Sequence, residues 1–109
     1  MKEDFVGYEL AVKLRKKGFN IDTDFCYNQD GGIVRVGTYP APQIHEVLNW
    51  LREEKKIYIN ISYSRMDKWF YKIYNLKNTG DFMLAADFDI ESYEQCAFEG
   101  IEYVTDYLI

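Results

Sequence analysis

The chain has 109 residues, of which 48% are hydrophobic and 28% charged, a size and composition typical of one globular domain. Its net charge of −5 disfavours the uniformly basic surface of most duplex-binding domains. Two widely separated cysteines, Cys26 and Cys96, and a single histidine argue against a structural zinc site, and no metal or other cofactor is expected.

The N-terminal segment predicts a helix from Asp4 to Lys17. Its apolar stripe is Val6, Leu10 and Leu14. Gly18 suits the left-handed position just after a helix, and Phe19 can fold back onto Leu14. The segment has no signal-peptide core, and no stretch of the chain reaches membrane-spanning length. A cytoplasmic protein with reduced thiols is therefore expected.

Two further elements follow in order. Residues 24–39 predict a hairpin around Asp30-Gly31-Gly32, where glycine supplies the positive φ of a tight turn, and Pro40 and Pro42 close it. Pro42 then suits the first turn of a second helix. The apolar stripe of that helix is Ile44, Val47, Leu48 and Leu51.

The segment from Lys55 to Tyr74, KKIYINISYSRMDKWFYKIY, alternates apolar and polar residues around a turn candidate, Arg65-Met66-Asp67-Lys68. Strand periodicity places Ile57, Ile59, Ile61 and Tyr63 on one face, with Trp69, Tyr71 and Ile73 of the next strand. A polar turn from Asn75 to Gly80 and the run DFMLAADFD complete a predicted three-stranded meander.

The C-terminal segment predicts a third helix. Ser92 and Gln95 have capping-box spacing ahead of it. The predicted stripe is Tyr93, Ala97, Ile101, Val104 and Leu108. Gly100 interrupts the helix and indicates a close approach to the sheet or to another helix, with a dimer contact as the alternative.

No residue pattern specifies a reaction. His45 is interpreted as a solvated helix residue because no nucleophile lies near it in the sequence, and Cys26 and Cys96 are interpreted as packing. Asp87, Asp89 and Glu91 could share one side of a strand and hold a cation, but the glycine-containing loop typical of calcium sites is absent, so a solvated strand edge is favoured.

The segments YPAPQIHEVLNWLREEKKIYINISY and SYEQCAFEGIEYVTDYLI resemble a family of small uncharacterised proteins of gut Bacteroidales and their phages or mobile elements. The matching residues are Ala41, Pro42, Trp50, Leu51, Arg52, Glu53, Ile57, Ile59, Tyr93, Glu94, Ala97, Gly100, Ile101, Leu108 and Ile109. Gln43 stands where the family often has Thr, so the usual N-cap hydroxyl is missing. The resemblance implies an intracellular accessory protein and no known activity.

These observations predict a single α+β domain over residues 1–109, ordered helix–hairpin–helix–meander–helix, with a mainly antiparallel sheet packed by three helices. The leading functional hypothesis is a non-enzymatic interaction protein that binds a protein partner or its own copy, as a homodimer, through an aromatic sheet face. The candidate residues are Tyr58, Phe70, Lys72 and Tyr74.

Three other functions remain open. A single-stranded nucleic-acid binder could use the same aromatic side chains for stacking. Its phosphate contacts would be Lys55, Lys56, Arg65, Lys68 and Lys72. An enzyme would require a pocket with convergent polar groups. The acidic segment 73–109, with eight carboxylates and one lysine, could imitate the charge of a nucleic acid.

Overall fold

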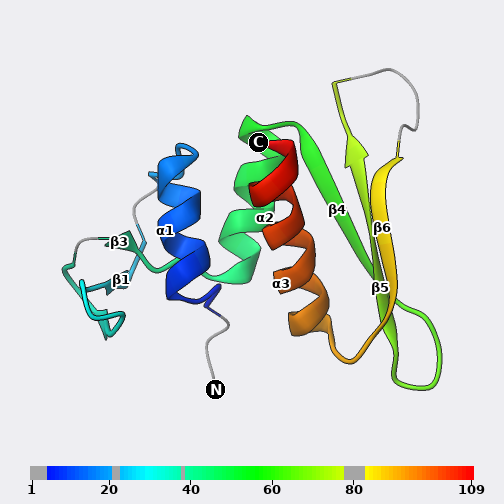
Figure 1. Cartoon of the computed structure of the whole chain (residues 1–109), viewed down its shortest axis with the longest axis horizontal. Coiled ribbons are helices and arrows are strands. Elements are labelled where there is room, and N and C mark those ends of the chain that lie inside the picture. Colours follow the sequence, from blue (N-terminus) through cyan, green and yellow to red (C-terminus); the bar gives the residue numbers. More distant parts are fainter. Residues whose placement is uncertain (1–4, 21–22, 38, 78–82) are drawn as a thin grey trace. The chain divides into compact units, whose positions relative to one another are not determined.

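Three helices and two small antiparallel sheets make up the described part of the chain, residues 5–20, 23–37, 39–77 and 83–109 of a computed structural model (Figure 1). The α+β class predicted from the sequence is therefore confirmed. The chain divides into two compact units, Met1–Glu46 and Val47–Ile109, and helix α2 (Ile44–Glu54) runs through the division. The prediction of a single domain stays a prediction.

Helix α1 (Tyr8–Lys16) begins after Gly7, whose φ of 90° is incompatible with a helical turn, so the helix is shorter than the pattern predicted. Gly18 has a φ of 102°, and the N–H groups of Gly18 and Phe19 donate to the carbonyls of Arg15 and Leu14. This is the predicted Schellman ending. Phe19 and Leu14 are both buried.

The first sheet has the strand order β2–β1–β3. Strands β1 (Cys26–Tyr27) and β2 (Ile33–Val34) form the predicted hairpin, in which only Gly31 of the two turn glycines has a positive φ. The predicted role of Pro40 is wrong. It belongs to a third strand, β3 (Tyr39–Pro40), which pairs with β1, and proline is tolerated there because β3 is an edge strand.

Helix α2 starts without the N-cap hydroxyl, as the sequence indicated. Instead, the carboxylate of Glu46 accepts a hydrogen bond from the backbone N–H of Gln43 at 2.9 Å, which is the return half of a capping box. Of the predicted stripe, Leu48 is only half-buried, whereas Trp50 is buried. His45 is exposed on this helix.

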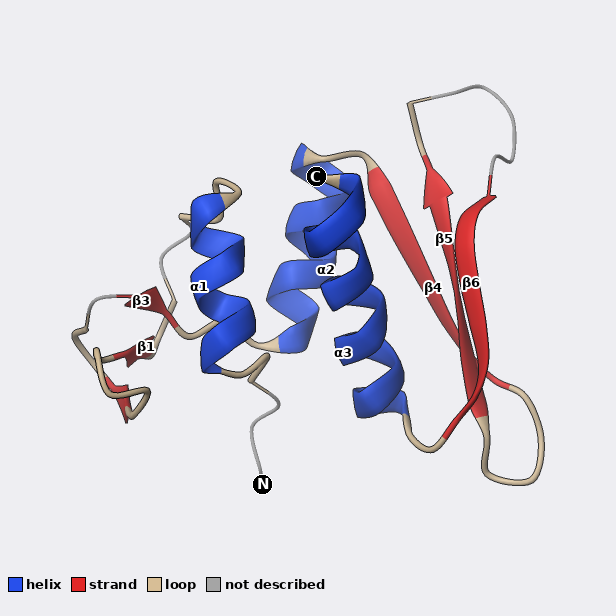
Figure 2. Ribbon diagram, viewed as in Figure 1, coloured by secondary structure: helices blue, strands red, loops and turns tan. Residues whose placement is uncertain are grey.

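The second unit contains the predicted meander, with strands β4 (Ile57–Tyr63), β5 (Trp69–Asn75) and β6 (Met83–Ile90) in the order β4–β5–β6 (Figure 2). Residues 78–80 of the predicted polar turn lie outside the described residues. The β4–β5 pairing runs without interruption from Ile57–Asn75 to Tyr63–Trp69. Met66 and Asp67 have φ values of 53° and 60°, and the N–H of Lys68 donates to the carbonyl of Arg65, so the turn is of type I′.

Helix α3 (Tyr93–Tyr103) packs on β4 and β5. The Ser92 hydroxyl accepts from the N–H of Gln95, which confirms the predicted cap. The stripe is shifted from the prediction, since Tyr93 is exposed and Cys96 is buried with Ala97 and Ile101. The helix then widens into a π-helical segment, η1 (Val104–Leu108), where the Thr105 hydroxyl donates to the carbonyl of Ile101.

Candidate functional site

The sheet of the second unit has one face covered by α3 and one that no helix of that unit covers. On the covered inner face, Ile59, Tyr71 and Ile73 are buried. Gly100 of α3 approaches this face so closely that a Cβ on it would lie 3.1 Å from the Ile59 Cγ2. The predicted close approach is therefore to the sheet of the same chain.

The opposite, outer face brings together the four candidate residues Tyr58, Phe70, Lys72 and Tyr74. Tyr58 and Tyr74 are cross-strand partners, and their rings are stacked with centroids 6.3 Å apart. Lys72 lies on β5 between Phe70 and Tyr74, and its Nζ is 5.6 Å from the centre of the Phe70 ring. At an exposed site, a cation over an aromatic ring contributes about 0.5–1 kcal/mol of stabilising energy.

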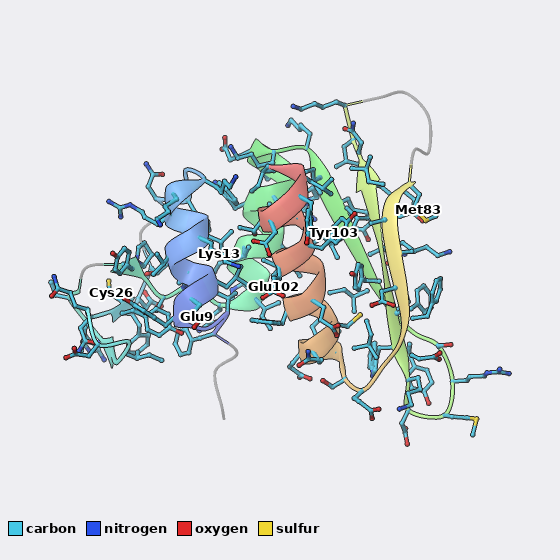
Figure 3. All side chains as sticks on the ribbon, viewed as in Figure 1. Glu9, Lys13, Cys26, Met83, Glu102 and Tyr103 are labelled. Atoms are coloured by element: carbon cyan, nitrogen blue, oxygen red, sulfur yellow. The ribbon has the colours of Figure 1, made fainter. Side chains whose placement is uncertain are left out.

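Two further residues on β6 belong to this surface. The Phe88 ring stacks on Phe70 with centroids 5.6 Å apart, and Met83 pairs across the sheet with Tyr74. Figure 3 shows Met83 on the side of β6 away from α3. We call Tyr58, Phe70, Lys72, Tyr74, Met83 and Phe88 the aromatic face.

The aromatic face is accessible. Tyr58, Met83 and Phe88 are 40%, 49% and 55% exposed, so no described segment covers these three side chains. Clustered aromatic and methionine side chains at the surface are characteristic of protein-binding sites, because each buries a large area at low entropic cost.

The alternation of side chains along a strand could not predict that Phe88 and Met83 lie on the outer face. The β5–β6 pairing shifts register between Trp69 and Tyr71 and again between Ile73 and Tyr74. The first shift lies near Asp89, which has a φ of 61°. Because each shift inserts an extra residue in β6, strict alternation fails along that strand. The only signal for Phe88 was a large aromatic residue in a strand rich in carboxylates.

The five cations proposed for phosphate contacts do not gather on the aromatic face. Lys55 and Lys56 precede β4, and the Lys55 ammonium lies 5.4 Å from the centre of the Trp50 ring. Arg65 belongs to the turn, and Lys68 forms an ion pair with Glu91. Lys72 is the member of this set that lies on the face.

The carboxylates and cysteines that could take part in metal binding or catalysis lie at separate positions in the structure. Asp87 pairs with Tyr71, Asp89 lies at the register shift, and Glu91 pairs with Lys68, so the three carboxylates do not converge. The described residues include no group of three or more His, Cys, Asp or Glu side chains that could hold a metal ion. Cys26, half-buried, and Cys96, buried, are both free thiols.

Two buried groups of the second unit have strongly shifted pKa values. Burial raises the pKa of Tyr71 to about 12, with a smaller contribution from the Asp87 carboxylate. Burial likewise raises the pKa of Cys96 to about 11, assisted by Glu99. Both groups are therefore neutral at physiological pH, and Cys96 lacks the thiolate character of a nucleophile.

An open hollow of about 450 Å³ lies at one end of this sheet. Its lining is Lys55, Ile57, Asn75, Lys77, Leu84, Leu108 and Ile109. These residues supply two cations and one amide but no carboxylate side chain, histidine or thiol that could act as a base or nucleophile.

Comparison of the chain with protein-family models, curated proteins and solved structures gave no match.

Among the residues described, no helix is long and apolar enough to cross a membrane.

Proposed function

We propose that the chain is a non-enzymatic interaction protein that binds another protein through the aromatic face. The supporting observation is that side chains from all three strands, among them Tyr58, Tyr74, Phe70 and Phe88, form two stacked pairs on a sheet surface exposed to solvent. Lys72 between the pairs favours a partner segment that combines apolar side chains with a carboxylate.

The distribution of cations favours a protein over single-stranded nucleic acid. Phosphate binding needs several cations beside the stacking platform, and Lys72 is the member of the proposed set that lies there.

The test compares proteins captured by the wild-type chain and by a Tyr74→Ser/Phe88→Ser variant. The expected result is that the double variant loses partners that the wild type retains. Tyr107→Ser is the matched control, since Tyr107 is 73% exposed on η1, away from the aromatic face. Equal capture by all three chains would contradict the proposal.

A titration with a labelled single-stranded oligonucleotide separates the two functions. We expect no binding at low salt. Binding that weakens steeply as salt is added, and that Tyr74→Ser/Phe88→Ser removes, would replace the protein-binding proposal with the nucleic-acid one.

A further inference from the structure

The second sheet has two edge strands, and their edges are protected unequally. Strand β6 carries two register shifts, the carboxylates of Asp87 and Asp89, and a positive φ at Asp89, all of which discourage pairing with another strand. Strand β4 has seven residues, IYINISY, with no charge, no proline and no register shift against β5. A regular, uncharged edge of this kind is a template for a further strand.

The hydrogen bonds at the two ends of β4 show which of its backbone groups point outward. Leu76 N–H donates to the Lys56 carbonyl at one end, and Ser64 N–H donates to the Lys68 carbonyl at the other. Even-numbered residues of this strand therefore bond to β5, because the pattern alternates along an antiparallel pair. The N–H and C=O groups of Ile57, Ile59, Ile61 and Tyr63 point away from it.

Nothing in the described part of the chain bonds to that outer edge through its backbone. The exposure of the side chains agrees with an open edge. Ile61 lies on the inner face and is half-buried, while Tyr71, its partner on the central strand, is buried.

We propose that a second copy of this chain pairs with β4, antiparallel and about a two-fold axis at Asn60. This surface is the edge of the sheet and is distinct from the aromatic face, so the proposal goes beyond the proposed function. The strand sequence is self-complementary in this register. Ile59 lies opposite Ile61 of the second copy and Ile57 opposite its Tyr63, which matches apolar side chains on the inner face.

The side chains on the outer face of the two copies also match across the junction. Tyr58 lies opposite Ser62 of the second copy, and the two Asn60 side chains meet at the axis. All four outward-pointing residues of each strand enter hydrogen-bonded pairs, which gives about eight new backbone hydrogen bonds across the junction. The two sheets join into one, and their aromatic faces lie on the same side of it.

Cations flanking β4 oppose this pairing. In the same register Lys55 lies opposite Arg65 of the second copy, and the pair recurs at the other end of the junction. Salt screens such repulsion. The dimer therefore tightens as salt rises, the opposite of nucleic-acid binding.

Sedimentation velocity of the full chain tests the proposal at protein concentrations up to about 100 µM, a range that detects micromolar affinity. A monomer–dimer equilibrium is expected, with a dissociation constant that falls between about 50 mM and about 500 mM salt. A chain that stays monomeric throughout, or a dimer that weakens with salt, would overturn the proposal.

Variants at the axis separate edge pairing from other modes of association. Asn60→Asp places a carboxylate beside Lys72, its partner on β5, which favours the folded monomer. It also places two carboxylates together in the dimer and should weaken it about tenfold. Mixing the Asn60→Asp and Asn60→Lys chains should restore a heterodimer. A dimer unaffected by Asn60→Asp, or no recovery on mixing, would overturn the pairing.

Ile61→Pro is a second variant that does not depend on charge. The N–H of Ile61 points away from β5, so proline removes no hydrogen bond of the sheet but blocks the outer edge. It should abolish the dimer while circular dichroism shows a folded chain. Tyr74→Ser/Phe88→Ser changes the central and opposite edge strands and should leave the dimer intact, so failure of this proposal and of the proposed function are distinguishable.

Discussion

At the scale of single residues, Gly100 determines how closely α3 packs on its sheet. Glycine in a helix costs about 1 kcal/mol relative to alanine, so a residue with a side chain would be preferred if space allowed. Space is limited, because the Ile59 Cγ2 lies 3.1 Å from the position of an added Cβ, and Ile59 is itself buried. Tight packing against the sheet therefore outweighs helix propensity here.

Gly100→Ala should lower the free energy of unfolding by about 1 kcal/mol, and Gly100→Val by about 3 kcal/mol, because overpacking costs more than alanine's helix propensity returns. Urea denaturation measures both. In the Ile59→Ala background the cost of Gly100→Ala should largely disappear, since the contacting Cγ2 is gone. Stabilisation by Gly100→Ala in the wild-type background would show that the helix is not held by this contact.

The buried side chains of Tyr71 and Cys96 make the free energy of unfolding sensitive to alkali. Folding raises the pKa of Tyr71 from 10.0 to about 12 and that of Cys96 from 9.0 to about 11, chiefly through burial. When the pH exceeds the ordinary pKa values of 10.0 for Tyr71 and 9.0 for Cys96, the unfolded chain loses protons that the folded chain keeps. The free energy of unfolding therefore falls as pH rises. The contribution is complete below about pH 9 and is lost progressively up to about pH 12.

These two groups should therefore leave the urea midpoint unchanged from pH 7 to about pH 9. Above about pH 9 the midpoint should decrease. Tyr71→Phe and Cys96→Ala should each make the decrease shallower, while Tyr107→Phe, which removes an exposed hydroxyl, is the control. An unchanged slope in both core variants would show that neither group remains protonated in the folded state.

At the scale of elements, the β4–β5 hairpin contains strain in its turn. Met66 and Asp67 both have positive φ values, a conformation that costs residues with a side chain about 1 kcal/mol or more. The turn is held by the Lys68 N–H bond to Arg65 and by a bond from the Asp67 N–H to the Tyr63 hydroxyl at 3.0 Å. Asn-Gly is the preferred pair for this turn type.

Met66→Asn combined with Asp67→Gly should raise the free energy of unfolding by about 1 kcal/mol, because the new residues adopt positive φ with little strain. Met66→Val, with a β-branched side chain at the same position, should lower it by a similar amount. Thermal unfolding followed by circular dichroism measures both changes. A loss of stability in the Asn-Gly variant would mean that the turn does not limit the hairpin.

The elements also show where sequence reasoning succeeds. Local chemistry predicted the Schellman ending at Gly18, the Ser92 cap and the turn at Met66-Asp67, because each depends on residues within a few positions of one another. The two-residue strand β3 and the register shifts in β6 depend on pairing between distant segments. No local pattern could predict them.

At the scale of the whole molecule, the same distinction applies to the candidate site. Alternation along β4 and β5 correctly placed Tyr58, Phe70, Lys72 and Tyr74 on one face, because the pairing of these strands is regular. It missed Phe88 and Met83, since the register shifts of β6 change which side chains point outward. The aromatic face is consequently larger than the sequence indicated and extends across all three strands.

We propose two different tasks for one sheet, one at the aromatic face and one at the β4 edge. The face, with its stacked rings around Lys72, is suited to a partner protein, whereas the regular edge is suited to a second copy. Pairing at the edge would double the aromatic area on one side of the joined sheet. Avidity from two linked sites can then raise affinity for a repeated or dimeric partner without any new contact.

Site-specific photo-cross-linking in cells tests the central claim, that the aromatic face binds a protein, most directly. A benzophenone amino acid replaces Phe88, which is 55% exposed on the face, or Tyr107, which is 73% exposed away from it. We predict a light-dependent adduct with another protein from position 88 and none from position 107. No adduct from position 88, or the same adducts from both positions, would contradict the account.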